Sequence, residues 1–464
     1  MGMKMKKVLA VLLTTAMCIG VLAGCGASSE DNKSPDSSGG AASAVEESGG
    51  ETAKTDSAVE EADGDPVNLR MMVFGSTEVY EDINREFFEI NEDLAGKVNI
   101  EVELGGSGDF DVAEKIRLAL ASGEELPDII RLNYTQLPEF AEAGILEPID
   151  RFVEPYNDNI IEGAKVIMEY NGTMYAFPRE IKPKIWYYRT DIFEECGIDP
   201  AEVKTVDDFI AAGEKIQEKY PNSHLENYNV PFQQYDLMMF LCATGGRFCD
   251  EEGNYDISAD EGTKKAFEMI GKIHDSSVNS TVAEWSADWG PAFASDELIS
   301  QLIAGWWRQD MKNWDIEELS GKIGLALWPE EIRYGSDAGG AIWVIPSSSK
   351  NKELAGDILA RMCFDEETAR MIYQKAKILP ALKSAMDDPV YNAQDDYFVG
   401  NIAAVNFEAM EYLKVYPYTP ASSQEITIVK QYLDEYLSGS MTVEEALKAA
   451  EDDLKNQIGN PYQQ

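Results

Sequence analysis

The sequence contains little of what catalytic metal sites and nucleic-acid interfaces require. Only two of its 464 residues are histidines, and neither has a cysteine, a second histidine or a paired carboxylate at ligand spacing. The sequence therefore offers few residues from which a zinc site or a histidine-based triad could be built. Lysine and arginine together number 39, against 84 aspartates and glutamates, for a formal net charge of −45. Because nucleic acids and anionic membrane surfaces are bound through basic patches, we expect neither as a partner.

Cysteine is also scarce, and its spacing matches no metal motif. Beyond the N-terminal segment four cysteines remain, at Cys196, Cys242, Cys249 and Cys363. Cys242 and Cys249 can form a bridge in an oxidising exterior, but we prefer four free and mostly buried thiols. The acidic segment 250–256 lacks the spacing of an EF-hand loop. We therefore predict neither a metal nor a cofactor.

A signal-like segment begins the chain. Three lysines precede the apolar run 8–22, which has the length of a signal-peptide core and is short for a membrane span. The run ends in the letters LAGC, which resemble the bacterial lipobox, where the cysteine is acylated and becomes the new N-terminus. We expect a lipoprotein signal peptide over 1–24 and lipidation of Cys25 by palmitate. The alternative is a plain secretory signal with a chance cysteine.

The segment that follows is poor in large hydrophobic residues. Between 26 and 65 the only ones are Val45 and Val59, and serine, glycine, alanine and acidic residues dominate. Such a segment cannot bury enough apolar surface to offset the entropy of ordering it. We expect a disordered tether over 25–65. The remaining body, about 400 residues, suits two lobes better than one core.

The body opens with alternating strand and helix patterns, which indicate an α/β fold. We expect strands at 67–74, 98–104 and 126–130, and helices at 78–91, 110–122 and 137–143. In such sheets ligands bind beyond the carboxyl ends of the strands. The segments that follow the expected strands are 76–78, 106–109 and 133–136.

The stretch 171–197 has the pattern of a connection between lobes. A short strand over 173–177 follows an Asn-Gly turn, and Pro178 is expected to stop it. A polar bridge, 179–184, leads to a second apolar run at 185–188. Two strands joined by an extended bridge suit a crossing over which a ligand is enclosed. An ordinary strand–loop–strand inside one domain fits the local pattern equally well.

Motifs along the whole body carry a family resemblance. They are ASGEELPDII, EFAEAGILEPID, NGTMYAFPREIKPKIWYYRTDIFEECGI, ATGGRF, DELISQLIAGWW, AGGAIWVIPSSSKNKELA and LSGSMTVEEALKAAEDDL. In this order, over roughly 66–458, they resemble the extracellular solute-binding proteins of ABC importers, the family that includes the maltose-binding proteins. Each motif alone is modest, but their order is specific.

The resemblance implies a two-lobed periplasmic-binding-protein type II fold with a ligand cleft between its lobes. The three hinge crossings are expected near 178–182, 327–330 and 378–380. Lobe 1 is expected to hold 66–178 and 330–380, and lobe 2 to hold 181–328 and 381–464. The resemblance further implies a receptor that closes over its solute and delivers it to an ABC permease, without an enzymatic step.

A sugar site requires flat aromatic rings beside carboxylates, amides and a cation. Trp307 matches the family's Gly-x-Trp aromatic, which stacks on sugar in maltose-binding members, and Arg308 offers a planar fork beside it. The alternative is that one tryptophan of the 306–307 pair lies in the core and the other on the surface. Phe232 matches a Pro-Tyr position without the hydroxyl, and Gln233 offers an amide. Leu132 stands where some maltose-binding members have tryptophan, which disfavours long maltodextrins.

Seven further residues complete the expected ligand contacts, because they follow strand ends, lie at the first crossing or in a loop, or permit close backbone approach. They are Ser76, Glu78, Asn133, Tyr134, Glu180, Trp285 and Gly340. For Glu180 an exposed hinge position is equally compatible, and so is core capping for Trp285.

The expected function is that of a monomeric, lipid-anchored receptor for a mono- or oligosaccharide, on the outer face of the cytoplasmic membrane of a Gram-positive bacterium. The absence of a basic cluster in the sequence disfavours a phosphate-bearing ligand. A sensor module for a membrane kinase is the main alternative. An exported glycoside hydrolase needs two carboxylates about 5 or about 6.5–9.5 Å apart, and no motif nominates a pair.

Overall fold

The computed structural model describes residues 65–463, apart from 306, 315, 335–339 and the side chain of Glu180. These residues belong to one compact unit, Gly64–Gln464. The expected signal peptide, the lipidation site Cys25 and the tether lie outside the described residues. Within the described part, no helix is both long enough and apolar enough to cross a membrane.

The first of two main sheets has five strands in the order β2-β1-β3-β10-β6. Their bounds are β1 Val67–Phe74, β2 Val98–Gly106, β3 Ile129–Asn133, β6 Ala176–Glu180 and β10 Ala341–Val344. Strand β1 runs parallel to β2 and β3, whereas β10 is antiparallel to β3 and β6. Every residue of β3 and β10 is buried, as expected for central strands with both faces covered.

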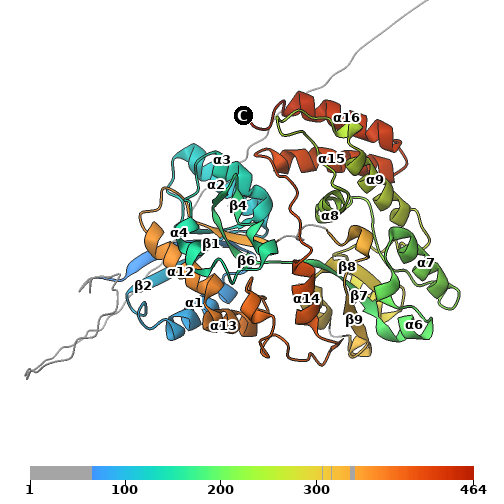
Figure 1. Cartoon of the computed structure of the whole chain (residues 1–464), viewed down its shortest axis with the longest axis horizontal. Coiled ribbons are helices and arrows are strands. Elements are labelled where there is room, and N and C mark those ends of the chain that lie inside the picture. The colour runs from blue at the N-terminus through green and yellow to red at the C-terminus, as the bar shows by residue number, and fades with distance from the viewer. Residues whose placement is uncertain (1–64, 306, 315, 335–339, 464) are drawn as a thin grey trace, which may run out of the picture. The chain divides into compact units, whose positions relative to one another are not determined.

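Figure 1 shows helices around this first sheet. They are α1 Glu78–Ile90, α2 Asp109–Ser122, α3 Leu137–Glu142, α4 Asp150–Val153, α5 Glu162–Lys165, α12 Lys352–Phe364 and α13 Glu366–Ala376. A small two-stranded sheet, β4 Glu169–Tyr170 with β5 Thr173–Met174, precedes β6. The strand and helix alternation confirms the predicted α/β class.

The second main sheet has four strands in the order β11-β9-β7-β8. Their bounds are β7 Lys184–Arg189, β8 Ser300–Ala304, β9 Ile323–Ala326 and β11 Phe398–Val399. The helices that follow in sequence from β7 are α6 Thr190–Glu195, α7 Val206–Gln217, α8 Gln234–Thr244, α9 Glu261–His274, α10 Trp289–Ala294 and α11 Trp307–Asn313. The chain ends in α14 Ile402–Met410, α15 Ser422–Leu437 and α16 Val443–Gln457.

Two expected strand boundaries that involve proline are wrong. Strand β6 does not stop at Pro178 but runs to Glu180, with Pro178 opposite Ile342 of β10. Because β6 is an edge strand, the missing proline N–H interrupts no second ladder. Strand β3 begins at Ile129 and not at 126, because proline at 127 has no N–H to donate and pairing with β1 starts only at Ile129.

The described cysteines form no disulfide, as preferred from the sequence. Cys196, Cys242, Cys249 and Cys363 are all unbridged. Cys242 and Cys363 are buried, and burial raises the pKa of the Cys363 thiol to about 12. The bridge between Cys242 and Cys249 that the sequence permitted is not formed.

Candidate functional site

Three side chains at the ends of different elements converge where the first sheet meets helix α8. Asn133 Nδ2, at the end of β3, donates to Asp109 Oδ2 over 2.6 Å. The Tyr235 hydroxyl, in the first turn of α8, donates to the same carboxylate oxygen over 2.9 Å. Burial, and next the charge of Asp109, raise the pKa of Tyr235 well above its usual range. The carboxylate thus joins a strand end of the first sheet to a helix that follows the second sheet's first strand.

The turn before α2 fixes the position of Asp109, the first residue of that helix. Asp111 Oδ2 accepts hydrogen bonds from the Ser107 N–H at 2.8 Å, the Ser107 hydroxyl at 2.8 Å and the Gly108 N–H at 3.1 Å. These donors, the Ser107 hydroxyl foremost, lower the pKa of Asp111. A side chain at Gly106 would lie 2.1 Å from Asp111 Cβ, so the turn closes only with glycine there.

Asn133 is fixed by the backbone that follows it. Its Oδ1 accepts from the Thr135 N–H at 3.0 Å, and its own N–H donates to Gln136 Oε1 at 3.3 Å. This reciprocal cap starts a 3-10 turn, Tyr134–Gln136, directly after β3. The Asn133 amide is therefore oriented before any ligand is present.

Tyr134 lines an opening between distant segments. A cavity of about 270 Å³ has walls from the 134–138 turn, from 166–171 and from 415–418. The rings of Tyr134 and Tyr418 meet edge to face, with centroids 5.7 Å apart. Tyrosine rings with hydroxyls near an opening offer both stacking faces and hydrogen bonds to a polar solute.

A second opening lies beside two of the expected crossings. This hinge cavity, of about 120 Å³, is lined by Ile181 and Lys182, by Gly305, Arg308 and Gln309, by 376–379 and by Asn406. Arg308, in the first turn of α11, donates from Nη2 to the Lys377 carbonyl at the end of α13. Arg308, an expected ligand contact, therefore lies where the segments 181–182 and 376–379 meet.

Buried charges lie beneath the start of β7. Lys184 Nζ pairs with Asp236, and each side chain is only 4% exposed. The Lys184 ammonium also lies 5.5 Å from the centre of the Trp328 ring. Burial raises the pKa of Asp236, against the opposing effect of Lys184. Burial, and next the Asp236 charge, raise the pKa of Glu284 to about 8.

The neighbouring amide network is consistent with a protonated carboxyl. Gln301 Nε2 lies 2.7 Å from Glu226 Oε1, 2.5 Å from Asn227 Oδ1 and 3.1 Å from Glu284 Oε1. Trp289 Nε1 donates to Gln301 Oε1 at 3.2 Å, which fixes the orientation of the amide. Two amide hydrogens face three acceptors, so a proton on Glu226 or Glu284 relieves the mismatch. Burial raises the pKa of Glu226 well above its usual range.

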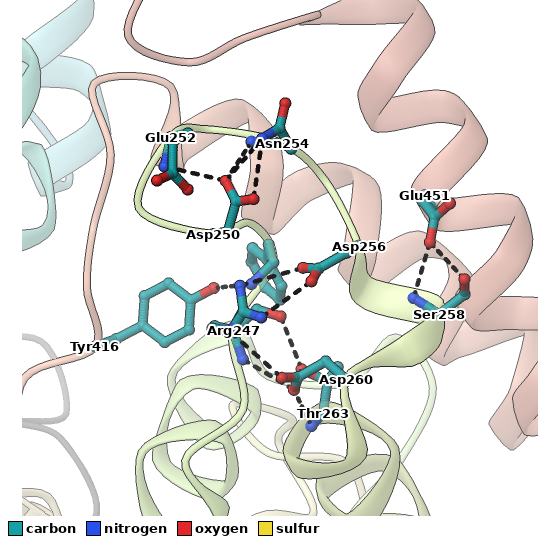
Figure 2. Close-up of polar contacts among 11 residues, drawn as sticks. Arg247, Asp250, Glu252, Asn254, Asp256, Ser258, Asp260, Thr263, Tyr416 and Glu451 are labelled. Atoms are coloured by element: carbon teal, nitrogen blue, oxygen red, sulfur yellow. Dashed lines mark hydrogen bonds and ion pairs between the residues drawn. The ribbon is translucent and has the colours of Figure 1, made fainter.

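The acidic segment before α9 is occupied by its own hydrogen bonds. Figure 2 shows Asp250 accepting from the N–H of Asn254 at 2.8 Å and of Glu252 at 3.0 Å, while Asp256 pairs with Arg247 at 3.0 Å. The Ser258 N–H donates to Glu451 of α16 at 3.1 Å. Across the described ranges no group of three or more potential ligand side chains is placed to hold a metal ion. These carboxylates organise the loop.

Some expected ligand contacts lie in the core. Trp307 is fully buried, and its ring packs at 5.0–5.6 Å from the rings of Tyr187, Trp289, Phe293 and Trp314. This matches the core alternative, and stacking on a sugar would require that cluster to open. Phe232 is 2% exposed and its ring meets Tyr228 at 5.0 Å, although it also borders a cavity of about 130 Å³ with Gln233 and Glu284.

The other expected contacts are scattered. Ser76 and Glu78 are exposed at the start of α1, where the Ser76 hydroxyl accepts from the Glu78 N–H at 3.2 Å. Trp285 is 60% exposed, with its ring 5.2 Å from Trp289. Gly340 is buried just before β10, and the side chain of Glu180 lies outside the described residues. The ligand roles of all these residues stay predictions.

Sequence reasoning missed Tyr235 and Lys377 as members of the site, whereas it placed Lys182 at the first crossing, facing the cleft. Asp109 was included only as part of a segment after a strand. Tyr235 follows the Pro-Phe-Gln position by a few residues. The one local signal that could have pointed to it is the start of a helix after residue 233. Lys182, Arg308 and Lys377 are far apart in the sequence, and nothing local indicates that they share a cavity.

Comparisons with known proteins identify the family of this chain. A sequence model of the bacterial extracellular solute-binding protein family matches residues 89–398, more than half of the chain. The arabinooligosaccharide-binding protein of Halalkalibacterium halodurans is 24% identical over 356 residues, covering 73% of this chain and 78% of that protein. The lactose-binding protein of Rhizobium radiobacter is 26% identical over 370 residues, covering 75% and 83%.

Solved structures show the same fold. The sugar-binding protein MalE of Xanthomonas citri has a TM-score of 0.71 at 19% identity, and the match covers 84% of this chain and 97% of that chain. The two sheets of this chain are thus those of the two-lobed periplasmic-binding-protein type II fold, as predicted. The family consists of solute receptors and not of enzymes. The chain belongs to the bacterial extracellular solute-binding protein family.

Proposed function

We propose that this protein captures a carbohydrate between its two lobes and delivers it to the permease of an ABC importer. The observation that carries the proposal is the convergence of Asp109, Asn133 and Tyr235. A carboxylate, an amide and a phenol are the groups with which proteins bind sugar hydroxyls. Relatives that bind arabinooligosaccharides and lactose support a carbohydrate as the solute.

The proposed lobes follow the two main sheets. Lobe 1, over 66–178 and 330–380, contains β1, β2, β3, β10 and most of β6. Lobe 2, over 181–328 and 381–464, contains β7, β8, β9 and β11. Closure of these lobes over the solute is the hinge motion of periplasmic receptors. In this proposal the Tyr235–Asp109 contact is made between the lobes.

The proposed location is the outer face of the cytoplasmic membrane. Acylation of Cys25 anchors the chain, and the segment 25–65 acts as a tether. The protein acts as a monomer, its membrane contact is the lipid anchor, and its macromolecular partner is the permease.

A thermal-shift panel tests the carbohydrate proposal. The purified protein is heated with mono-, di- and oligosaccharides, including arabinooligosaccharides and lactose, and separately with amino acids and peptides. A ligand at one hundred times its Kd adds about 2.7 kcal/mol, which raises the melting temperature by about a few degrees. We expect at least one saccharide to do so. Stabilisation only by amino acids or peptides would overturn the proposal.

A further inference from the structure

A cavity near the start of α8 has a carboxyl group in its wall. This Glu284 cavity has a volume of about 130 Å³ and is lined by 227–233, Ala283 and Glu284. Among the described lining residues, Glu284 is the only charged one. The wall includes Gln233, two residues before Tyr235, so the cavity lies near the proposed solute contacts of that tyrosine.

The charges behind this wall contain a surplus of carboxyl groups. Glu226 and Glu284 both lie beside Gln301 Nε2, at 2.7 and 3.1 Å, so the two carboxyls are close together. Among the described residues the cation of this cluster is Lys184, which is paired with the buried Asp236. Three carboxyls therefore share one ammonium, and a second cation would balance them. The body positions outside the described residues contain no lysine or arginine; they are 180, 306, 315, 335–339 and 464.

The cluster holds a proton where it lacks a second cation. Burial, and next the Asp236 charge, raise the pKa of Glu284 to about 8, against the opposing effect of Lys184. Burial also raises the pKa of Glu226, and burial and the Glu226 charge raise the pKa of Tyr228. An ammonium group beside Glu284 favours the charged carboxylate, so it would take the place of this proton.

Polar side chains in the wall have hydrogen-bonding capacity that the described residues do not use. Tyr228 is 3% exposed, and its hydroxyl has no hydrogen-bond partner in the described structure. Asn229 Nδ2 donates to two backbone carbonyls, at 2.9 and 3.0 Å, which leaves its Oδ1 to accept. Within the described ranges Gln301 is the one donor to the Glu284 carboxyl. A buried hydroxyl without a partner is costly, which indicates a partner from outside the protein.

These groups match a primary ammonium. It has three N–H donors and no acceptor, and the wall offers the Glu284 carboxylate, Asn229 Oδ1 and the Tyr228 oxygen. The Phe232 ring also lines the cavity, and aromatic rings attract cations. The volume exceeds the roughly 10–15 Å³ that one water molecule needs, so an amino group fits.

We propose that the solute is an amino sugar whose ammonium group binds in the Glu284 cavity. This inference rests on the proposed carbohydrate function. The ammonium donates to Glu284, Tyr228 and Asn229, and the proton that Glu284 held leaves to solvent. The class of ligand is a hexosamine, or an oligosaccharide of hexosamines, with a free amino group. An N-acetylated sugar lacks the charge and therefore does not match.

Titration calorimetry with matched sugars tests this site. Each set contains a free amine, its N-acetylated form and the corresponding hydroxyl sugar. The sets are glucosamine, N-acetylglucosamine and glucose; galactosamine, N-acetylgalactosamine and galactose; and the β-linked disaccharides of the glucose set. We expect at least one amino sugar to bind at least about tenfold more tightly than both of its neutral partners, because a charge-assisted hydrogen bond contributes that much.

Proton release gives a second readout. At about pH 7 the free protein holds the Glu284 proton, and the amine of the sugar is largely protonated as well. Binding of the amino sugar should therefore release protons to the buffer. The observed heat should then differ between phosphate and HEPES, because the ionisation enthalpies of these buffers differ. The difference should be much smaller for a neutral sugar.

Variants locate the effect. Glu284→Gln keeps the shape of the side chain and removes its charge, so it should weaken amino-sugar binding roughly 10- to 100-fold and abolish the proton release. Tyr228→Phe removes a hydroxyl without a partner in the described structure, so it should preserve the melting temperature and weaken amino-sugar binding roughly threefold. Glu251→Gln is the matched control, since Glu251 is an exposed carboxylate in another loop, and it should change nothing. A melting curve of each variant confirms that it is folded.

The results that would overturn this inference differ from those that would overturn the proposed function. Neutral sugars that bind as tightly as the amino sugars, or equal heats in the two buffers, would remove the ammonium site and leave the carbohydrate receptor intact. A folded Glu284→Gln or Tyr228→Phe protein with unchanged affinity for the amino sugar would do the same. Absence of binding by every saccharide would remove the proposed function and this inference together.

Discussion

The Tyr235 hydroxyl donates to Asp109 Oδ2 over 2.9 Å, and this bond ties the first turn of α8 to the first residue of α2. The same oxygen accepts from Asn133 at the end of β3, so one carboxylate of α2 is bonded to both α8 and β3. A hydrogen bond to a charged acceptor contributes about 1.5–3 kcal/mol, which is enough to influence an equilibrium between two lobe arrangements.

Tyr235→Phe removes this hydroxyl and keeps the ring. We expect the affinity for a saccharide to fall roughly tenfold, because the closed arrangement loses a charge-assisted hydrogen bond. Tyr432→Phe is the control, since its hydroxyl donates to Asp453 of α16 at 2.7 Å. Calorimetry on both variants makes the comparison. Equal affinities for the two variants would show that the Tyr235 bond has no part in closure.

Gly106 and Gly108 form a matched pair in the turn before α2. A methyl group at Gly106 meets Asp111 Cβ at 2.1 Å, whereas one at Gly108 has nothing within 4 Å. Gly106→Ala should therefore lower the free energy of unfolding by about 1–3 kcal/mol, as overpacking does, and Gly108→Ala should have little effect. Denaturant titration measures both. A Gly106→Ala protein as stable as Gly108→Ala would mean that the turn has another conformation.

Glu284 makes stability depend on pH in a defined direction. Its pKa is raised to about 8 in the folded protein, above the usual value of 4.5, so the folded state holds a proton that the unfolded state releases. The contribution of this group to stability is thus present at acidic pH and is lost as pH rises from about 4.5 through about 8.

Glu284→Gln keeps the shape of the side chain and removes the titration. The variant should match the parent protein near pH 4.5 and exceed its stability by at least about 1 kcal/mol at pH 8.5. Glu226 and Asp236, whose pKa values burial also raises, are present in both proteins, so the difference reports Glu284. Melting temperatures across this range give the result. Parallel curves of melting temperature against pH for the two proteins would show that the pKa of Glu284 is not raised.

Trp307 distinguishes a core role from a stacking role. Because the ring is fully buried among four aromatic side chains, Trp307→Ala should cost about 3–5 kcal/mol of stability. Trp307→Phe should cost less, since the indole N–H has no hydrogen-bond partner in the described structure. Unfolding by guanidinium chloride measures the stability of each variant. A Trp307→Ala protein of parental stability that fails to bind sugar would assign the ring to the ligand instead.

The local elements were predictable, because their signals lie in neighbouring residues. Strand β1 at Val67–Phe74 and helix α1 at Glu78–Ile90 follow directly from hydrophobic periodicity. The expectation that Pro178 ends its strand was wrong, because only the sheet order shows that β6 is an edge strand, where proline is tolerated. Propensity describes a residue's own preference and not its place in a sheet.

The site was less predictable, because it depends on contacts between distant segments. Arg308 was expected from its position after an aromatic, but its neighbours Lys182 and Lys377 come from other parts of the chain. Trp307 and Phe232 were expected to face a ligand, and the structure packs both into hydrophobic clusters. An aromatic side chain fits a core and a sugar site equally well, and only tertiary packing separates the two.

Small-angle X-ray scattering, with and without the saccharide that gives the largest thermal shift, tests most directly whether the protein captures a carbohydrate by lobe closure. Closure brings the two lobes together, so we predict that the radius of gyration falls when that saccharide is bound and recovers when it is removed by dialysis. A radius of gyration that stays unchanged at saturating saccharide would contradict capture by closure.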